Sequence, residues 1–336
     1  MSAADVSARP EFLALIGPTA SGKTDLSLAL AERVRIEVIS MDSRQVYRGM
    51  DVGTDKVPEP ARARVPHHGL DTVAPSERYS AGQFARDARR WIEQIQRRSN
   101  LPVLVGGTGF FLRAVMDPVF REPPLDPGRR EALRRYLRGQ PLERLGRWVE
   151  HLDGERAALA RAGGPQRLSR TLEVALLSGR PLSWWHRSAP PEAAGLPGTV
   201  VLLDLPRDEM DRRIDERVGG MVARGLVEEV EGLISAGYGP DAPGMTGTGY
   251  REIAAYLGGA VSLEDALAQI RSATRRYARR QLTWYRHQLP ASVQRVDATL
   301  PVTEQVEIVI AAYERDGGTV TWRVSADESV KEGMRT

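Results

Sequence analysis

The sequence contains no cysteine and only three lysines among its 336 residues. Without thiols the chain has no disulfide framework, no thiolate metal site and no cysteine nucleophile. No apolar run reaches the ~18 residues that a membrane-spanning helix needs, and the N-terminal MSAADVSARPEF lacks the basic and apolar segments of a signal peptide. We therefore expect a cytoplasmic protein with no membrane partner.

Length and composition favour a folded chain with more than one part. Hydrophobic residues account for 41% and charged residues for 27%, which excludes a disordered protein. A chain of 336 residues exceeds what one ordinary core holds, and it suits a large α/β domain that carries a smaller insertion.

The positive charge comes almost entirely from arginine and is unevenly distributed. The formal net charge is only +3, which by itself does not indicate a nucleic-acid partner. Residues 121–190 hold 14 Arg against 8 acidic residues, and residues 271–287 hold six Arg and no acidic residue. These two stretches carry +12 together, so the rest of the chain carries −9. The distribution, rather than the total, marks candidate surfaces for an anionic partner.

Apolar runs typical of buried strands alternate with helical patterns near the N-terminus. We expect strands at Glu11–Ile16, Arg35–Ser40 and Leu101–Val105, and helices at Lys23–Arg33 and Ser80–Arg98. Thr199–Leu205 is again a continuous apolar run, residues 207–290 are mostly helical in pattern, and Val293–Val296 is a candidate last strand. Strand–helix–strand alternation predicts a parallel sheet with flanking helices.

The pattern changes between residues 121 and 187, where no strand is predicted. Breaks that carry proline or glycine separate helical segments at Gly128–Arg138, Leu142–Leu152 and Gln166–Leu177. We therefore interpret this region as a helical insertion. The predicted organisation is an α/β core at 1–120 and 196–316, a helical insertion domain at 121–195 and a peripheral tail at 317–336.

A glycine-rich loop follows the first predicted strand and opens the first predicted helix. It matches the pattern G-x-x-x-x-G-K-[ST], whose backbone N–H groups surround phosphate oxygens at the helix N-terminus. Its lysine supplies a charge for the terminal phosphate, and the hydroxyl of its last residue is a ligand for Mg²⁺. The pattern predicts binding of a diphosphate or a longer polyphosphate and does not choose between them. The predicted binding residues are Gly17, Pro18, Thr19, Ala20, Ser21, Gly22, Lys23 and Thr24, with Thr24 as the metal ligand.

Polar segments follow the predicted strands. A nucleoside-triphosphate enzyme needs a strand-end carboxylate for magnesium, and both Asp42 and Asp204 fit that requirement, so the pattern does not choose between them. The segment from Asp42 to Lys56 is dense in hydrogen-bonding groups, and Gly106–Gly109 follows the third strand. Each segment alone is also compatible with a capped loop or a plain turn. Because parallel strands end along one edge of a sheet, the loops together predict a shared cleft.

Several segments, taken together, resemble a known enzyme family. GPTASGKT (17–24), DSRQVYRGMDVGTDK (42–56), PHHGLD (66–71), YSAGQFARDA (79–88), PVLVGGTGF (102–110) and RQLTWYR (280–286) occur in the order and spacing of bacterial tRNA dimethylallyltransferases. The resemblance runs from about Phe12 to about Pro290. It implies a P-loop NTPase-like parallel sheet with flanking helices and a mostly helical insertion. It also implies transfer of a dimethylallyl group from dimethylallyl diphosphate to N6 of tRNA adenosine 37, next to the anticodon, with release of diphosphate.

The resemblance also implies catalytic roles for individual residues. Asp42 corresponds to the base that accepts a proton from the amine, Thr108 to a contact at the reacting adenine, and Arg217 to a diphosphate ligand. An aromatic amine is a poor nucleophile, so a positioned base helps. Loop N–H groups and Mg²⁺ would stabilise the charge that develops on the diphosphate. The adenine has to leave the anticodon-loop stack to reach this site. The resemblance gives Asp204 no catalytic role, so we interpret it as a structural residue at the end of a strand.

The same resemblance implies a surface for the tRNA anticodon stem-loop. Three departures accompany it: Ala162–Pro165 stand where the family has an Asn-Asp pair, Phe111 stands for Tyr, and GTDKV replaces GTAKP. The residues so implied in tRNA binding are Asp42, Ser43, Arg44, Gln45, Thr108, Arg130, Gln166, Arg167, Leu168, Ser169, Arg170, Gly247, Thr248, Gly249, Tyr250, Arg251 and Glu252.

Residues 271–287, which contain no acidic residue, also suit an RNA partner. Arg271, Arg275 and Arg279 recur at helical spacing and predict a basic face for phosphates. Each of these arginines, taken alone, is more simply interpreted as a solvated residue. We expect Trp284 and Tyr285 to pack in the core rather than stack on bases.

Other conspicuous residues have plain structural interpretations. Arg212 and Arg213 are interpreted as solvated helix arginines. The adjacent His67 and His68 are interpreted as structural, because neighbouring side chains on an extended chain point apart.

Two alternative functions remain open from the residues alone. A P-loop small-molecule kinase would use the insertion as a lid and transfer phosphate from ATP. An RNA-binding module, ATP-driven or non-catalytic, would bind RNA without forming a prenyl product, although a base beside a phosphate loop argues against it. Nothing in the sequence indicates an obligate oligomer, so we expect a monomer.

Overall fold

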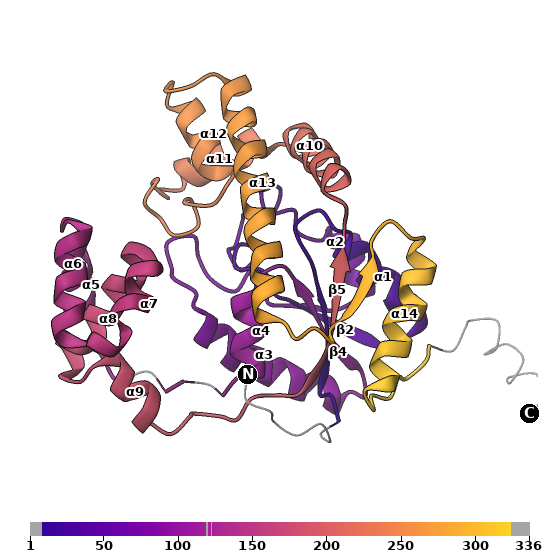
Figure 1. The fold of residues 1–336 in the computed structure, drawn as a ribbon. Coiled ribbons are helices and arrows are strands. Elements are labelled where there is room, and N and C mark those ends of the chain that lie inside the picture. The colour runs from indigo at the N-terminus through magenta and orange to yellow at the C-terminus, as the bar shows by residue number, and fades with distance from the viewer. Residues whose placement is uncertain (1–8, 119, 122, 324–336) are drawn as a thin grey trace, which may run out of the picture. The chain divides into compact units, whose positions relative to one another are not determined.

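Within residues 9–118, 120–121 and 123–323, which the computed structural model describes, six strands form one parallel sheet (Figure 1). The chain divides into two compact units. The core unit, Met1–Asp117 with Gly195–Thr336, contains the sheet, and the helical unit is Pro118–Ala194. Each unit has a hydrophobic core of its own.

The sheet is built mainly from buried apolar runs. Its strands are β1 (Phe12–Ile16), β2 (Ile36–Ser40), β3 (His67–His68), β4 (Leu101–Gly106), β5 (Gly198–Asp204) and β6 (Gln294–Asp297). They lie in the order β3-β2-β4-β1-β5-β6. Central β1 pairs in parallel with β4 and β5, with Leu13 opposite both Val103 and Thr199. Because all residues of β1 and β4 are buried, these strands are uninterrupted apolar runs.

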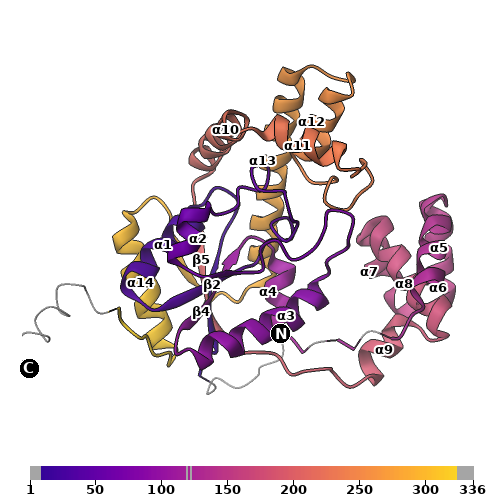
Figure 2. The ribbon, with the colours of Figure 1, turned by 180° about the vertical axis from the view of Figure 1, so that it is seen from behind.

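Helices cover both faces of the sheet (Figures 1 and 2). They are α1 (Lys23–Arg33), α2 (Glu59–Arg64), α3 (Ala81–Arg97), α4 (Gly109–Met116) and α14 (Val302–Arg315). Helix α1 packs beside α14, whereas α3 packs beside α4 on the opposite face. The side chain of Ser80 caps α3 by accepting a hydrogen bond from the N–H of Gln83, as its residue type predicts.

A second group of helices follows β5 in the core unit. It consists of α10 (Arg207–Ala223), α11 (Leu226–Ser235), α12 (Tyr250–Leu257) and α13 (Leu263–Gln288). Helix α13, with 26 residues, packs against α10 and α12 and also against α4 (Figure 1). It therefore connects this helical group with the loops that follow the strands.

The helical unit contains no strand among its described residues, as the sequence predicts. Its elements are α5 (Pro127–Arg138), α6 (Leu142–Leu152), η1 (Gly154–Arg156), α7 (Ala157–Ala162), α8 (Gly164–Ser178) and α9 (Leu182–Ser188). Leu145 and Val149 of α6 pack with Leu168 and Leu172 of α8 in its core. Helix α8 begins two residues before the expected Gln166, because proline is tolerated in a first helical turn.

Part of the predicted peripheral tail is hydrogen-bonded within the core unit. The N–H of Arg35 donates to the carbonyl of Thr321 (2.8 Å), and the N–H of Arg323 donates to the carbonyl of Arg33 (2.7 Å). Residues 321–323 are therefore hydrogen-bonded to the segment that joins α1 and β2. Residues 324–336, the rest of the predicted tail, lie outside the described residues, as do residues 1–8. In the described part of the chain, no helix is long and apolar enough to span a bilayer.

Candidate active site

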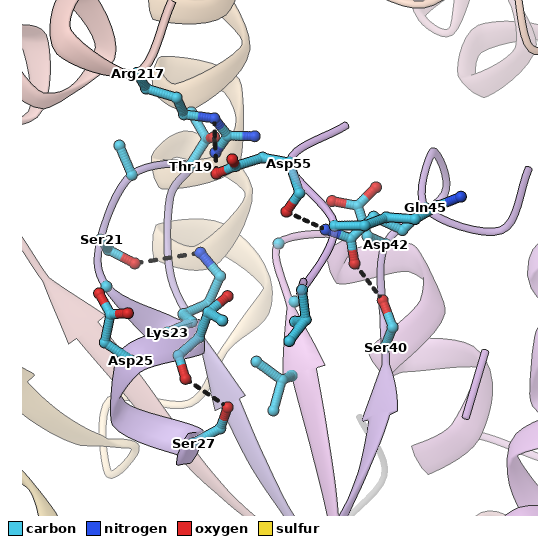
Figure 3. Close-up of a pocket in the computed structure, with 18 of the residues that line it drawn as sticks. Thr19, Ser21, Lys23, Asp25, Ser27, Ser40, Asp42, Gln45, Asp55 and Arg217 are labelled. Atoms are coloured by element: carbon cyan, nitrogen blue, oxygen red, sulfur yellow. Dashed lines mark hydrogen bonds and ion pairs between the residues drawn. The ribbon is translucent and has the colours of Figure 1, made fainter. Parts of the chain in front are cut away.

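A cavity of about 450 Å³ lies in the core unit where several strands end (Figure 3). The loops after β1, β2 and β4 form its walls together with α10 and α13. Thr19 to Thr24, Asp42, Gly107 and Arg217 all line it, so the structure brings the phosphate loop and the two other polar loops into one cleft.

The phosphate loop forms an anion site at the start of α1. Gly22 adopts a left-handed conformation (φ 82°), which a residue with a Cβ adopts only under strain. No side chain caps α1, and the first N–H groups of a helix have no intrahelical acceptor. These N–H groups and the helix dipole favour an anion at this position.

Lys23 lies inside this loop. Its Nζ donates to the carbonyls of Gly17 (3.0 Å) and Pro18 (2.6 Å) and to Ser21 Oγ (3.2 Å). Burial and, after it, the nearby Arg217 lower the pKa of Lys23 to about 7, while Asp42 acts in the opposite direction. Lys23 and Arg217 thus lie close enough for their charges to repel each other, and a bound polyphosphate would relieve this repulsion.

Asp42 and Thr108 follow the adjacent strands β2 and β4, and Asp42 lines the cavity. Asp42 Oδ1 accepts a hydrogen bond from the N–H of Arg44 (2.8 Å), and Thr108 Oγ1 accepts one from the N–H of Ser43 (3.2 Å). Gly106 permits this approach, because a Cβ there would collide with the Met41 carbonyl. The carboxylate and the hydroxyl are thereby fixed relative to each other.

Tyr277 of α13 completes this side of the site. Burial, and then the nearby Asp42 carboxylate, raises its pKa to about 12, against a hydrogen bond with Thr108 that lowers it. The phenol therefore stays protonated at neutral pH and offers a donor beside the carboxylate.

Helix α13 also clamps two loops through residues whose role the sequence did not reveal. Gln281 Oε1 accepts the N–H of Thr19 (3.0 Å), and its Nε2 donates to the carbonyl of Gly107 (2.9 Å). The Tyr285 hydroxyl lies 3.0 Å from the carbonyl of Gly17 and 3.1 Å from that of Gly107. Tyr285 is buried as expected, but it packs with its hydroxyl directed at the site. No local pattern reports these contacts, because the partners are 174 to 268 residues apart.

The arginines of α10 differ in their surroundings. Arg217 Nη1 donates to Thr19 Oγ1 (2.9 Å), so this residue lies at the phosphate loop. The interpretation of Arg213 as a solvated residue is wrong: it lines the cavity and is held by Glu209 (2.6 Å). Arg212 is exposed and also pairs with Glu209 (2.7 Å), as interpreted.

Two further strand-end residues have structural contacts. Asp204 does not line the cavity and pairs with Arg295 (2.8 Å), which leaves Asp42 as the strand-end carboxylate in the cleft. His67 and His68 form the edge strand β3, and His68 Nε2 lies 2.8 Å from Glu37. His67 also lines the cavity.

The expected tRNA-contacting residues of the core unit fall into two groups. Arg44 Nη1 donates to the carbonyl of Pro243 (3.0 Å), so this loop lies near the Gly247–Glu252 segment. Thr248 and Arg251 are exposed, whereas Tyr250 and Glu252 are buried. Tyr250 donates to Glu229 (2.6 Å) and Glu252 caps Gly249 (2.8 Å). Gln45 is similarly occupied, because it accepts from Ser40 (2.7 Å) and donates to the carbonyls of Thr54 and Asp55.

In the helical unit the expected tRNA contacts are also divided. Gln166 and Arg167 are exposed on α8, and Ser169 and Arg170 are partly exposed. Leu168 is buried in the core of this unit, so its side chain supports α8 instead of facing a ligand. Arg130 Nε donates to Glu173 (3.0 Å), which is itself almost fully buried.

The predicted basic face of α13 is not a single free surface. Arg275 donates to Asp215 of α10 (2.5 Å), and Arg271 lies 3.8 Å from the same carboxylate. These two arginines therefore join α13 to α10. Arg279, by contrast, is exposed. The prediction of one basic face was only partly right, because helical periodicity alone does not show which neighbouring element covers part of a helix.

A parallel sheet with this loop between its first strand and first helix defines a P-loop-type α/β protein. The sequence matches the family described as IPP transferase over residues 45–288 and the family described as isopentenyl transferase over residues 10–62. The chain belongs to the IPP transferase family, and it is an enzyme of the prenyl-transferring class.

Individual relatives match over most of their length. The chain is 44% identical to the tRNA dimethylallyltransferase of Thermomicrobium roseum, covering 87% of this chain and 88% of the relative. It is 40% identical to that of Geobacillus thermodenitrificans, covering 89% and 94%. Among solved structures, the full-length tRNA isopentenylpyrophosphate transferase of Bacillus halodurans is 34% identical, with a TM-score of 0.65 and coverage of 91% and 97%.

Proposed function

We propose that the protein transfers a dimethylallyl group from dimethylallyl diphosphate to N6 of adenosine 37 of tRNA, giving N6-(dimethylallyl)adenosine and diphosphate. The names of its relatives support the reaction. The helical unit and the exposed parts of the core unit would hold the anticodon stem-loop.

One observation carries this proposal: a single cavity combines an anion site, a carboxylate and an apolar wall. Val38, Val57 and Val105 line the same cavity as Lys23 and Asp42. These valines suit a five-carbon prenyl chain attached to a diphosphate. A nucleotide would instead need polar partners for its ribose and base.

The chemistry assigned to the residues follows from their positions. Asp42 accepts the proton that N6 loses as it forms the new bond to the prenyl carbon. The bond between that carbon and the diphosphate oxygen breaks. The leaving diphosphate takes up negative charge beside the α1 N-terminus, Lys23 and Arg217. Thr108 and Tyr277 would orient the adenine next to Asp42.

The site fits a magnesium ion that binds together with the substrate. The described residues contain no cluster of three or more His, Asp or Glu side chains that could hold a metal alone. Thr24 lines the cavity and offers one hydroxyl, and Mg²⁺ commonly takes its other ligands from substrate phosphates and water. Bound in this way, Mg²⁺ would neutralise charge on the diphosphate.

A labelling experiment tests the proposed function. The protein is incubated with Mg²⁺, dimethylallyl diphosphate labelled in the prenyl group, and tRNA with adenosines at positions 36 to 38. We expect label in the tRNA, and we expect it to be lost when adenosine 37 is replaced by guanosine.

The two alternative functions give different results under the same conditions. A small-molecule kinase would consume ATP and leave the tRNA unlabelled. An RNA-binding module would retain tRNA on a filter without incorporating label. Either result would overturn the proposal.

A further inference from the structure

Asp55 forms an ionic bridge at the mouth of the cavity. Its Oδ1 accepts a hydrogen bond from Arg224 Nη2 (2.8 Å), and its Oδ2 lies 3.4 Å from Arg217 Nε. Arg217 in turn donates to Thr19 Oγ1 (2.9 Å) in the phosphate loop. Figure 3 shows Asp55, Arg217 and Thr19 together at one end of the site. Asp55 and both arginines line the cavity.

The two arginines share this one carboxylate. Arg217 lies on α10, and Arg224 directly follows the last residue of this helix. The two arginines are seven positions apart, close to two helical turns, so both project from the same side of the helix. No other ion pair of either arginine is found among the described residues. The pair therefore has one negative charge for two guanidinium groups. A diphosphate would supply more negative charge, together with oxygens that suit guanidinium hydrogen bonds.

The loop that carries Asp55 is held by other contacts. Glu229 of α11 accepts hydrogen bonds from three successive N–H groups, those of Asp51, Val52 and Gly53, at 2.7 to 3.0 Å. Gln45 Nε2 donates to the carbonyls of Thr54 and Asp55, at 3.2 Å each. The loop backbone is thus fixed independently of the Asp55 side chain, which is about two-fifths exposed.

We propose that Arg224 is a second arginine of the diphosphate site, and that the Asp55 carboxylate holds Arg217 and Arg224 in the place of the diphosphate until the substrate binds. When the diphosphate enters, it takes over both guanidinium groups and Asp55 turns to solvent. When the diphosphate leaves, Asp55 takes them back. Asp55 therefore weakens diphosphate binding and assists its release. This inference deepens the proposed function and rests on it for the identity of the substrate.

Binding of inorganic diphosphate to the full-length protein tests the role of Arg224 without any transfer reaction. Isothermal titration calorimetry in the presence of Mg²⁺ measures the Kd. For Arg224→Gln we expect a Kd about 10-fold higher, the effect of losing a charge-assisted hydrogen bond. The matched control is Arg212→Gln, which removes an exposed arginine of the same helix paired with Glu209, and here the Kd should change less than twofold. An unchanged Kd for Arg224→Gln would overturn the assignment.

The substitution Asp55→Asn tests the exchange itself. Asp55 has a left-handed backbone (φ 54°), which asparagine also tolerates, so the loop should keep its shape. Because the competing charge is lost, we expect the Kd for diphosphate to fall about three- to 10-fold. The release of diphosphate, followed by stopped-flow displacement, should slow by a similar factor. A higher Kd for Asp55→Asn would show that Asp55 supports the arginines instead of competing for them, and would contradict the proposal.

These measurements separate the inference from the proposed function. If diphosphate binding responds to both substitutions but no prenyl group reaches tRNA, the inference stands and the proposed function fails. If transfer is normal and Arg224→Gln leaves both the Kd for diphosphate and the KM for dimethylallyl diphosphate unchanged, the inference fails and the proposed function stands.

Discussion

At the scale of single residues, the site contrasts a buried cation with a carboxylate that lies across the cavity from it. Lys23 has a pKa lowered to about 7 by burial and by Arg217, whereas Asp42 opposes that shift. A bound diphosphate would compensate the charge of Lys23 and leave Asp42 facing the acceptor amine. The proposed roles, anion binding for Lys23 and proton acceptance for Asp42, thus agree with where the two residues lie.

Replacing the carboxylate tests this division. Asp42→Asn keeps the side-chain oxygen that accepts the N–H of Arg44 but removes the base. We expect kcat to fall by roughly 10²- to 10⁴-fold, typical of a lost general base, while the Kd for tRNA stays within about threefold. Asp204→Asn is the control, since this strand-end carboxylate pairs with Arg295 outside the cavity. Near-normal turnover of Asp42→Asn would exclude Asp42 as the base.

The buried carboxylate of Glu37 links stability to pH. Burial of Glu37 raises its pKa, but hydrogen bonds from Arg98, His68 and Asn100 outweigh this and lower it to about 2. The ordinary pKa is 4.5, so the stabilisation is fully present above pH 4.5 and is lost as the pH falls towards 2.

Urea unfolding measured over this pH range tests the Glu37 cluster. At neutral pH we expect Glu37→Gln to lower the free energy of unfolding by about 2 kcal/mol, the effect of losing hydrogen bonds to a buried charge. The difference from the unmodified protein should shrink as the pH falls from 4.5 towards 2. Glu307→Gln, at an exposed ion pair with Arg33, should change stability little at any pH. A pH-independent difference for Glu37→Gln would contradict the assignment.

At the scale of elements, α13 organises the site. Through Gln281 and Tyr285 it holds the phosphate loop after β1 and the Gly-Gly-Thr loop after β4, and through Tyr277 it reaches Asp42 and Thr108. It also packs against α10, which carries Arg217. The relative positions of the two loops therefore depend on one helix.

Gln281→Leu removes the amide group of Gln281, and with it both hydrogen bonds to the two loops, while the side chain keeps a similar size. The N–H of Thr19 and the carbonyl of Gly107 would lose their partners. We expect the free energy of unfolding to fall by about 1–3 kcal/mol and the Kd for diphosphate to rise. Thr283→Ala, two residues along α13 and exposed, is the control. Unchanged diphosphate binding in Gln281→Leu would show that the clamp does not shape the phosphate loop.

The elements also show how far the sequence predicts this fold. The helices at Lys23–Arg33 and Leu142–Leu152 are confirmed to the residue, and a residue that breaks regular structure, Gly22 or Pro141, directly precedes each of them. The two-residue strand β3 was not predicted, since its histidines carry no apolar run. Helix α4 was not predicted either, and its first residue, Gly109, is the last residue of the Gly106–Gly109 segment that was also compatible with a plain turn.

The candidate site was predictable in part for a related reason. The phosphate loop and Asp42 are local patterns next to strands, so the sequence displays them. Gln281 and Arg224 join the site through contacts with residues far away in the chain, which no local pattern encodes. Asp55 stood out only as part of a loop that differs from the family pattern.

At the scale of the whole molecule, the two units offer different capacities. The core unit contains the cavity, and the helical unit carries 14 Arg within residues 121–190 around its own apolar core. We infer that the first binds the diphosphate and that the second contributes mainly to holding RNA, whose phosphates favour arginine.

A core substitution in the helical unit tests this separation. Leu172 is fully buried there, and Leu172→Ala should destabilise that unit by about 2–5 kcal/mol. We expect the Kd for tRNA to rise while the Kd for inorganic diphosphate stays unchanged, both measured by calorimetry. Leu159→Ala, at an exposed position of the same unit, should leave both values unchanged. Equal losses in both affinities would show that the two units do not act separately.

The central claim is the transfer of a dimethylallyl group to tRNA. Mass spectrometry of nucleosides from tRNA treated with the protein, Mg²⁺ and dimethylallyl diphosphate tests it most directly. We predict that adenosine 37 gains one C5H8 unit at N6, in an amount equal to the diphosphate released, and that Asp42→Asn abolishes most of this gain. Unmodified adenosine 37 in tRNA that binds the protein would contradict it.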